Sequence, residues 1–122
     1  MQYNLKGGAG IDMTAELRSY LETRLAHHVD GFLARDTAAH ANVEFEHAPL
    51  RDGEKYRAEL TVSTSGAVYR AEAWGETLHS AIDVAVDGLS RELRRAKRKR
   101  VHVLRHGASR IKDFLRGWRT RP

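Results

Sequence analysis

The chain of 122 residues contains no cysteine. This absence excludes a disulfide-stabilised scaffold, a thiol nucleophile and a thiolate-bound zinc ion, and it agrees with a reducing compartment such as the cytoplasm. No stretch approaches the ~18 consecutive apolar residues of a transmembrane helix. The first ten residues, MQYNLKGGAG, lack the basic and apolar regions of a secretory signal. We therefore expect one soluble, cytoplasmic chain without a membrane partner.

Motifs of catalysis and cofactor binding are also missing. The sequence has no HExxH, no GxSxG, no GxxxxGK[ST] and no GxGxxG. The one pair of histidines four residues apart, His102 and His106, lies among arginines that would repel a metal cation. Asp83 and Asp87 share one predicted solvent-facing helix surface and are expected to keep that half of the helix soluble. The sequence thus predicts no catalytic residue, no metal, no cofactor and no small-molecule substrate.

Positive charge is present in excess, and it is concentrated at one end. The net charge is +5, but residues 91–122 carry 13 Lys/Arg against 2 acids, a net of +11. Residues 1–90 carry the other 8 basic and 14 acidic residues, a net of −6. An acidic body that ends in a strongly basic segment indicates a polyanionic partner.

Apolar periodicity predicts six main elements. Alternating apolar and polar residues predict four strands, and apolar residues at helical spacing predict two helices. Thr14 and Thr77 are the expected N-caps, and Gly31 is expected to end the first helix. Small alanines of the last strand, Ala71 and Ala73, would let a helix pack close to the sheet. The predicted strands are residues 2–6, 41–46, 57–62 and 68–74, and the helices run from 15 to 29 or 32 and from about 78 to 99.

The resulting order, β-α-β-β-β-α, predicts an α+β fold in which two helices cover one face of a four-stranded sheet. This topology resembles a double-stranded-RNA-binding domain. That family places lysines at the start of its last helix, to meet phosphates across a groove of the duplex. Residues 77–80 of this chain, Thr-Leu-His-Ser, carry no lysine. Recognition of duplex RNA in that manner is therefore not expected.

The second half of the last helix carries the main functional signal. Arg91, Arg94, Arg95 and Arg98 fall on one face, opposite an apolar stripe from Leu78 to Ala96. A solvated helix end favoured by the macrodipole explains one or two cations. Seven within ten residues, with a single acid among them, indicate phosphate binding instead, since guanidinium groups grip two phosphate oxygens each.

Residues 103–122 are predicted to be a separate basic tail following a domain of residues 1–102. Ile111, Phe114, Leu115 and Trp118 fit one face of a short helix flanked by Gly107 and Gly117. A helix of this length is marginal alone. The tail is therefore expected to be flexible or to fold on binding.

Two stretches carry a family resemblance. The opening MQYNLKG with IDMTAELRSYLETRLAHHV, and the run AEAWGETLHSAID followed by LSRELRRAK, resemble the hibernation promoting factors and ribosome-associated inhibitor A proteins, also called sigma-54 modulation proteins. The resemblance covers about residues 1–100. It implies binding to the small ribosomal subunit in the channel for mRNA and tRNA, with translation blocked in stationary phase or stress. It also implies that the protein binds whole ribosomes.

The same resemblance implies which residues contact 16S rRNA. Arg98 is added to the residues implied by the resemblance, because it lies on the same basic face of the helix. Three departures stand out: Thr77 and His79 replace an Asp and a Tyr, and His28 occupies a usually apolar position and is expected to be partly buried. The expected rRNA-binding residues are Arg24, His27, Arg91, Arg94, Arg95, Lys97, Arg98 and Lys99.

We expect the short form of the family, which lacks the C-terminal dimerisation domain of the long form, since only about 20 residues follow the packed helix. The sequence leaves open whether the protein pairs ribosomes with a separate ribosome modulation factor or silences single ribosomes. A second interpretation also stays open, in which the chain is a regulatory protein that binds free RNA or a transcription component.

Overall fold

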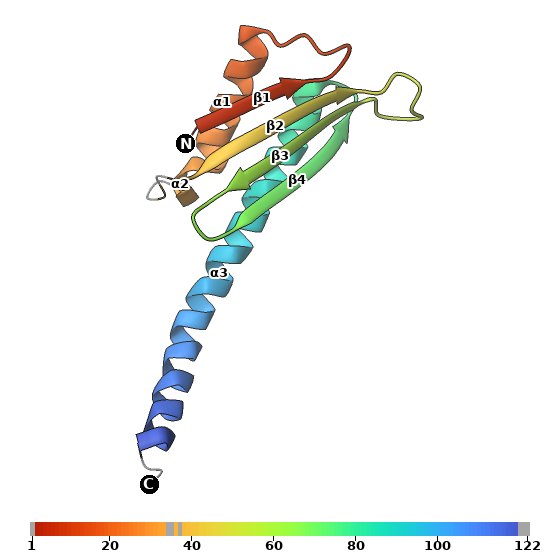
Figure 1. The fold of residues 1–122 in the computed structure, drawn as a ribbon. Coiled ribbons are helices and arrows are strands. Elements are labelled where there is room, and N and C mark those ends of the chain that lie inside the picture. Colours follow the sequence, from red (N-terminus) through yellow and green to blue (C-terminus); the bar gives the residue numbers. More distant parts are fainter. Residues whose placement is uncertain (1, 34–35, 37, 120–122) are drawn as a thin grey trace.

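The chain folds as an α+β sandwich in the predicted order (Figure 1). A computed structural model describes residues 2–33, 36 and 38–119, and for Phe32 and residues 100–119 it describes the backbone alone. One short helix, α2, comes in addition to the predicted elements. The elements are β1 (Gln2–Gly7), α1 (Ala15–His28), α2 (Asp30–Leu33), β2 (His40–His47), β3 (Tyr56–Ser63), β4 (Val68–Gly75) and α3 (Leu78–Arg119).

The four strands form one sheet in the order β1-β2-β3-β4. β1 and β2 are parallel, since α1 carries the chain back between them, whereas β2, β3 and β4 form an antiparallel meander. Val43 lies opposite Leu5 on one side and Leu60 on the other. The apolar residues of neighbouring strands therefore meet on the same face, as the alternation predicted.

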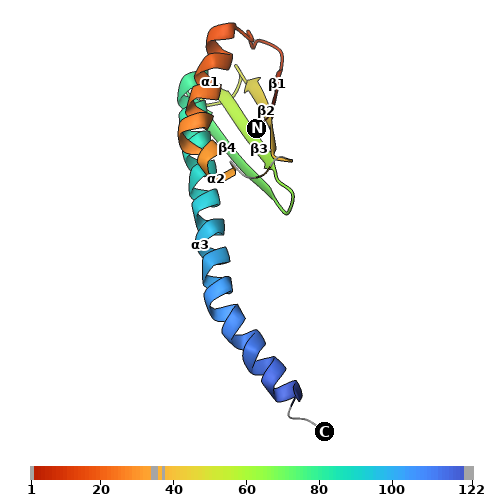
Figure 2. The same cartoon turned by 90° about the vertical axis from the view of Figure 1, so that its left-hand side faces the viewer.

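Both long helices lie on that face, and the other face of the sheet is left uncovered (Figure 2). The core between sheet and helices is apolar, and its largest fully buried side chains include Leu21, Leu25, Leu60, Ile82 and Leu89. Burial of a side chain of this size contributes roughly 1.5–3 kcal/mol to stability. This one-sided packing confirms the predicted fold class.

The first helix begins where predicted and ends slightly earlier. The Thr14 hydroxyl accepts a hydrogen bond from the Leu17 backbone N–H at 3.1 Å, which caps the first turn. The helix breaks at Val29, whose side chain is fully buried, two residues before Gly31. His28 is exposed, so the expectation of partial burial is wrong. The buried Val29 anchors the end of the helix in its place.

The start of α3 is held against the end of β4 by a tight turn. Ser80 N–H donates to the Thr77 hydroxyl, and Thr77 N–H donates to the Ser80 hydroxyl, each at 3.1 Å. A Cβ on Gly75 would lie 2.4 Å from Ser80 Oγ and 2.6 Å from the Ala81 backbone nitrogen. Further along, a Cβ on Gly88 would lie 3.8 Å from the Cβ of Ala71. Small residues thus bring α3 close to the sheet, as expected.

The Gly75→Ala substitution should therefore destabilise the protein. The added methyl group meets backbone as well as a side chain, so the turn must shift, at a cost of about 1–3 kcal/mol. Thermal unfolding followed by circular dichroism should show a midpoint lower by several degrees. Gly66→Ala is the matched control, because nothing lies within 4 Å of its added Cβ. Equal midpoints for the two variants would contradict this account of the turn.

The third helix continues well beyond the sheet. It has 42 residues, a length of roughly 63 Å, and among the described side chains Leu93 is the last buried one. The sequence pattern predicted that the packed helix ends by about Lys99 and that a separate tail follows, which is flexible or folds on binding. The backbone instead runs unbroken to Arg119, because no proline interrupts it and neither Gly107 nor Gly117 ends it. The division at residue 103 and the behaviour of the tail stay predictions.

None of the described helices combines the length and the apolar composition that crossing a bilayer requires.

Candidate nucleic-acid interface

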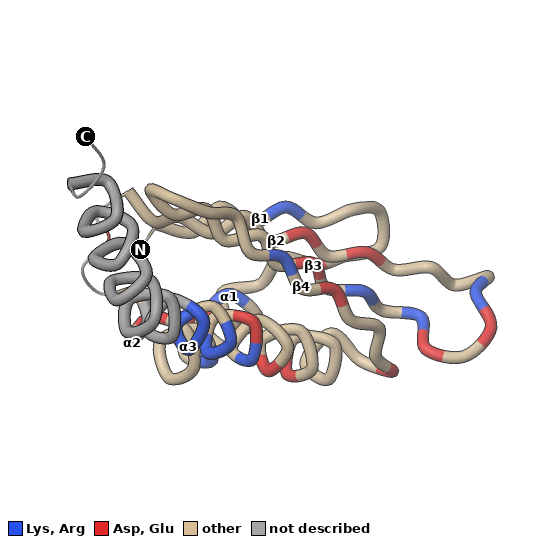
Figure 3. The backbone as a smooth tube through the Cα atoms, turned by 90° about the horizontal axis from the view of Figure 1, so that it is seen from below, with Lys and Arg blue, Asp and Glu red and all other residues tan. Residues whose placement is uncertain are grey.

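The basic side chains of α3 lie on its solvent side. Leu89 and Leu93 are buried against the sheet, which fixes the rotation of the helix at this level. Figure 3 shows the basic and acidic positions along α3 from below. The predicted orientation is confirmed, and contact with RNA stays a prediction. The exposed basic residues are Arg91, Arg94, Arg95, Lys97, Arg98 and Lys99.

Two of these arginines hold acidic partners on their own helix. Arg91 Nη2 lies 3.1 Å from Asp87 Oδ2, and Arg95 Nη1 lies 3.2 Å from Glu92 Oε1. The side chains of Arg91 and Asp87 are 64% and 63% exposed. Such solvated pairs contribute at most about 1 kcal/mol. A phosphate group can therefore displace the carboxylates at little cost.

The residues predicted on α1 lie alongside α3. His79 Nε2 is 2.9 Å from Glu16 Oε1, and Arg24 Nε is 2.8 Å from Asp83 Oδ1. Since both pairs follow the same order along the two helices, α1 and α3 run parallel. His27, one turn beyond Arg24, is exposed. The structure therefore brings the predicted α1 residues to the same side of the sheet as the basic half of α3.

Asp83 does more than the solvating role expected for it. Its Oδ1 accepts a hydrogen bond from the Tyr20 hydroxyl at 2.6 Å in addition to the one from Arg24. Burial acts to raise the pKa of Asp83, but the hydrogen bonds from Arg24 and Tyr20 outweigh it and lower the pKa below its usual value. The hydrogen bond to Asp83 raises the pKa of Tyr20 in turn. Asp83 thus joins α1 to α3 and orients an arginine of the predicted site.

The departures at the start of α3 also have a structural role. His79 pairs with Glu16, and its ring lies edge-on to Tyr20 with centroids 4.5 Å apart. Thr77 caps the first turn of the helix together with Ser80. Both residues lie at the end of the helix pair where Asp12, Glu16 and Glu76 line a hollow, and the expected difference from the family's packing stays a prediction.

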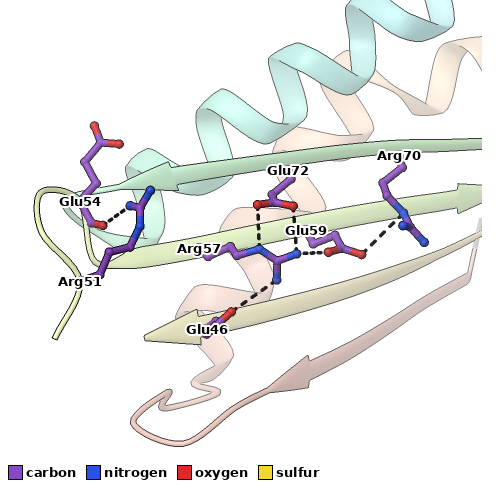
Figure 4. Close-up of polar contacts among 7 residues, drawn as sticks. All are labelled: Glu46, Arg51, Glu54, Arg57, Glu59, Arg70 and Glu72. Atoms are coloured by element: carbon purple, nitrogen blue, oxygen red, sulfur yellow. Dashed lines mark hydrogen bonds and ion pairs between the residues drawn. The ribbon is translucent and has the colours of Figure 1, made fainter. Parts of the chain in front are cut away.

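The uncovered face of the sheet neutralises its own charge (Figure 4). Arg57 lies at its centre and contacts Glu59, while its Nη1 is 3.6 Å from Glu46 Oε2 and its Nε is 3.1 Å from Glu72 Oε1. Arg70 Nε lies 3.7 Å from the other oxygen of Glu59. This network holds strands β2, β3 and β4 together. It leaves no excess of positive charge on this face, in contrast to α3.

The Arg57→Met substitution should lower stability and invert its pH dependence near pH 5. The hydrogen bond from Arg57 lowers the pKa of Glu72 below its ordinary 4.5, although burial opposes this. Stability from this pair is therefore complete above pH 4.5 and is lost as the pH falls through the pKa of Glu72 in the folded protein. Without Arg57 the pKa of Glu72 loses the hydrogen bond that lowers it and keeps the burial that raises it, while the neighbouring carboxylates repel one another. The variant should therefore gain stability as the pH falls from 7 to 5.

Urea unfolding at pH 7 and pH 5 measures this effect, and a loss of about 1–3 kcal/mol is expected for Arg57→Met at pH 7. Arg70→Met is the matched control, since the Arg70 side chain is 67% exposed and has one long contact. A variant whose stability is independent of pH between 7 and 5 would contradict the proposed repulsion.

A hollow of about 330 Å³ lies between the first turns of α1 and α3. Asp12, Glu16 and Glu76 line it together with Leu17 and Tyr56. Its carboxylates disfavour a phosphate. In the ranges that the structure describes, no group of three or more His, Asp and Glu side chains is arranged to hold a metal ion. The hollow therefore adds nothing to the anion-binding surface.

Comparison with known proteins places the chain in a family. The family model described as Sigma 54 modulation protein / S30EA ribosomal protein matches residues 6–101. The chain belongs to this family. The resemblance found over residues 1–100 is thereby confirmed.

Individual relatives agree with this assignment. The chain is 34% identical over 104 residues to the ribosome hibernation promoting factor of Azotobacter vinelandii, covering 83% of this chain and 87% of that protein. It is 28% identical over 108 residues to the ribosome hibernation promotion factor of Picosynechococcus, covering 88% of this chain and 55% of that protein. The chain thus spans about half the length of the latter relative and of its Bacillus subtilis counterpart.

Solved structures share the fold. The N-terminal domain of Protein Y from Thermus thermophilus superposes with a TM-score of 0.63 at 30% identity, covering 78% of this chain and 98% of that one. A ribosomal subunit interface protein from Coxiella burnetii superposes with a TM-score of 0.65 at 20% identity, covering 80% and 98%.

Proposed function

We propose that the chain binds the small ribosomal subunit through the basic half of α3, lies in the channel for mRNA and tRNA, and thereby blocks translation in stationary phase or stress. The observation that carries the proposal is the location of the excess positive charge. Arg57 and Arg70 of the sheet face are paired with glutamates, whereas α3 exposes six basic residues against two acidic partners within residues 87–99. The relatives from Azotobacter vinelandii and Picosynechococcus are both named as ribosome hibernation factors, which supports the ribosome as the partner.

The proposed contact is with the phosphate backbone of 16S rRNA. Arg91, Arg94, Arg95 and Arg98 lie at i, i+3, i+4 and i+7 on a helix anchored by its buried face. Guanidinium groups on such a scaffold lose little freedom on binding and can each grip two phosphate oxygens. Lys97, Lys99, Arg24 and His27 extend the surface, and the basic segment from residue 103 adds further contacts.

The proposed mechanism is occlusion, in the cytoplasm and without a cofactor or a chemical step. Contacts to phosphates position a protein without reading sequence. Specificity for the ribosome then comes from the fit of the whole domain to folded rRNA. The alternative, a regulator of free RNA, differs in one measurable respect. A ribosome-binding factor should bind purified small subunits far more tightly than unstructured RNA of equal length.

Reversing charge on α3 should weaken binding strongly without unfolding the domain. We expect Arg91→Glu with Arg95→Glu to weaken binding to small subunits by about 100-fold, or roughly tenfold for each charge-assisted hydrogen bond that the substitutions remove. The thermal midpoint should change little, since these side chains are 64% and 72% exposed. Quantitative co-sedimentation over a range of salt concentrations measures both affinity and its salt dependence.

The matched single variants are Arg91→Glu and Arg18→Glu. Each arginine sits on a helix surface and pairs with an acid four residues away at 3.1 Å. For the wild type, about 5–7 phosphate contacts give a slope of log affinity against log salt of roughly −4 to −6. Arg91→Glu should make this slope shallower, and Arg18→Glu should not. Equal effects of the two would mean that binding senses net charge alone.

Occlusion makes a separate prediction about competition. A protein in the decoding channel must exclude tRNA, so labelled tRNA bound at the P site with mRNA should displace the chain from small subunits. Filter binding with both ligands labelled measures this. The double variant Arg91→Glu, Arg95→Glu, which binds weakly, gives the background signal of chain that is retained without specific binding. If both ligands bind one subunit at full affinity, the occlusion model fails, although ribosome binding elsewhere would survive.

A further inference from the structure

Arg24 is held in a manner unlike the other arginines of the basic surface. Its Nε donates to Asp83 Oδ1 at 2.8 Å, and its guanidinium carbon lies 5.9 Å from the centre of the Tyr20 ring. Its side chain is 38% exposed, whereas those of Arg91 and Arg95 are 64% and 72% exposed. Arg24 is therefore fixed by another helix, while Arg91 and Arg95 pair only with acids of their own helix.

The hydrogen bond to Asp83 uses the Nε side of the guanidinium, and Tyr20, which itself donates to Asp83, is the other residue that interacts with it. Among the described residues, the two terminal nitrogens of Arg24 pair with no acid other than Asp83. These two nitrogens form the planar fork that matches two oxygens of a phosphate. An arginine already oriented in this way loses less conformational entropy when it binds than one that must be ordered.

Asp83 is in turn fixed by a second contact. The Tyr20 hydroxyl donates to the same Oδ1 at 2.6 Å, and the Tyr20 ring is packed edge-on against His79, which pairs with Glu16. The carboxylate is therefore held from α1 by both Tyr20 and Arg24. This differs from Asp87, which is 63% exposed and contacts only Arg91 on its own helix.

We propose that Asp83 is a positioning residue, which holds the Arg24 guanidinium so that its two terminal nitrogens are presented to one phosphate of the bound RNA. This inference rests on the proposed function. It makes an acidic residue necessary for binding a polyanion. Simple electrostatics requires the opposite, because removing an acid near the interface raises the positive charge and should strengthen binding.

The two accounts therefore predict effects of opposite sign for the same substitution. Asp83→Ala should weaken binding to purified small subunits by about three- to tenfold if Asp83 positions Arg24. Asp87→Ala is the matched control, one helical turn away, because it makes the same change in charge and removes the acidic partner of Arg91. It should leave affinity unchanged or raise it. An Asp83→Ala variant that binds as well as Asp87→Ala would overturn the proposal.

A double-mutant cycle separates positioning from a merely structural role. Arg24→Ala should weaken binding about tenfold, and Asp83→Ala should have no further effect in the Arg24→Ala background. A structural role of Asp83 would instead weaken binding in both backgrounds. If Asp83→Ala does not fold, Asp83→Asn replaces it, because the amide keeps the shape of the side chain and loses the charge that grips Nε.

The wild type and the Arg91→Glu variant distinguish the two levels of the proposal. If the wild type fails to bind small subunits, the proposed function fails. If the wild type binds and Arg91→Glu binds more weakly, but Arg24→Ala binds like the wild type, the proposed function stands and the positioning role of Asp83 is wrong. In the free protein, the Arg24 Nε–H resonance should be protected from exchange and should lose this protection in Asp83→Ala.

Discussion

The close packing of α3 on β4 sets the position of every basic residue on the exposed side of that helix. Gly75 admits the turn because a side chain there would collide with Ser80 and Ala81, and small residues along β4 let the helix lie near the sheet. Once Ile82 and Leu89 are buried, the rotation of the helix about its axis is fixed. The arginines that follow Leu89 then face solvent without any further constraint. The exposed row of basic residues is thus a consequence of core packing, extended along a helix.

Charge on the rest of the domain is arranged so that it does not compete. On the uncovered sheet face, Arg57 is surrounded by three glutamates from three strands, and these pairs link β2, β3 and β4. At the opposite end of the helix pair from the basic residues, carboxylates line the hollow between the first turns of α1 and α3. Among the described side chains, positive charge is therefore concentrated on the exposed side of α3.

The sequence was sufficient to predict strands and helix starts, which depend on residues close together in the chain. It did not predict contacts between elements, which depend on how one helix or strand is aligned with the next. Alternation around Val43 and Leu60 was sufficient for the strands, and Thr14 and Thr77 marked the helix starts. The partners of Asp83 lie 63 and 59 positions away, so only the packing of α1 against α3 brings them together. The rows Glu16, Tyr20, Arg24 and His79, Asp83, Asp87 both have a spacing of four residues. That repeat was the available signal for a helix seam, but it does not say which rows face each other.

The same limit explains the other differences. The cluster of glutamates around Arg57 can be predicted only when the alignment of the strands is known. Glu46 and Arg57 are cross-strand partners, and so are Glu59 and Glu72. The end of α1 at Val29 was decided by burial of that side chain, which local propensity does not report. The parallel pairing of β1 with β2 has a consequence for synthesis as well. Gln2 pairs with His40, so the first strand to leave the ribosome must wait for α1 and β2 before it has a partner, whereas the β2–β3–β4 meander can assemble from neighbouring segments. β1 therefore waits longer for its neighbouring strand than the strands of the meander wait for theirs.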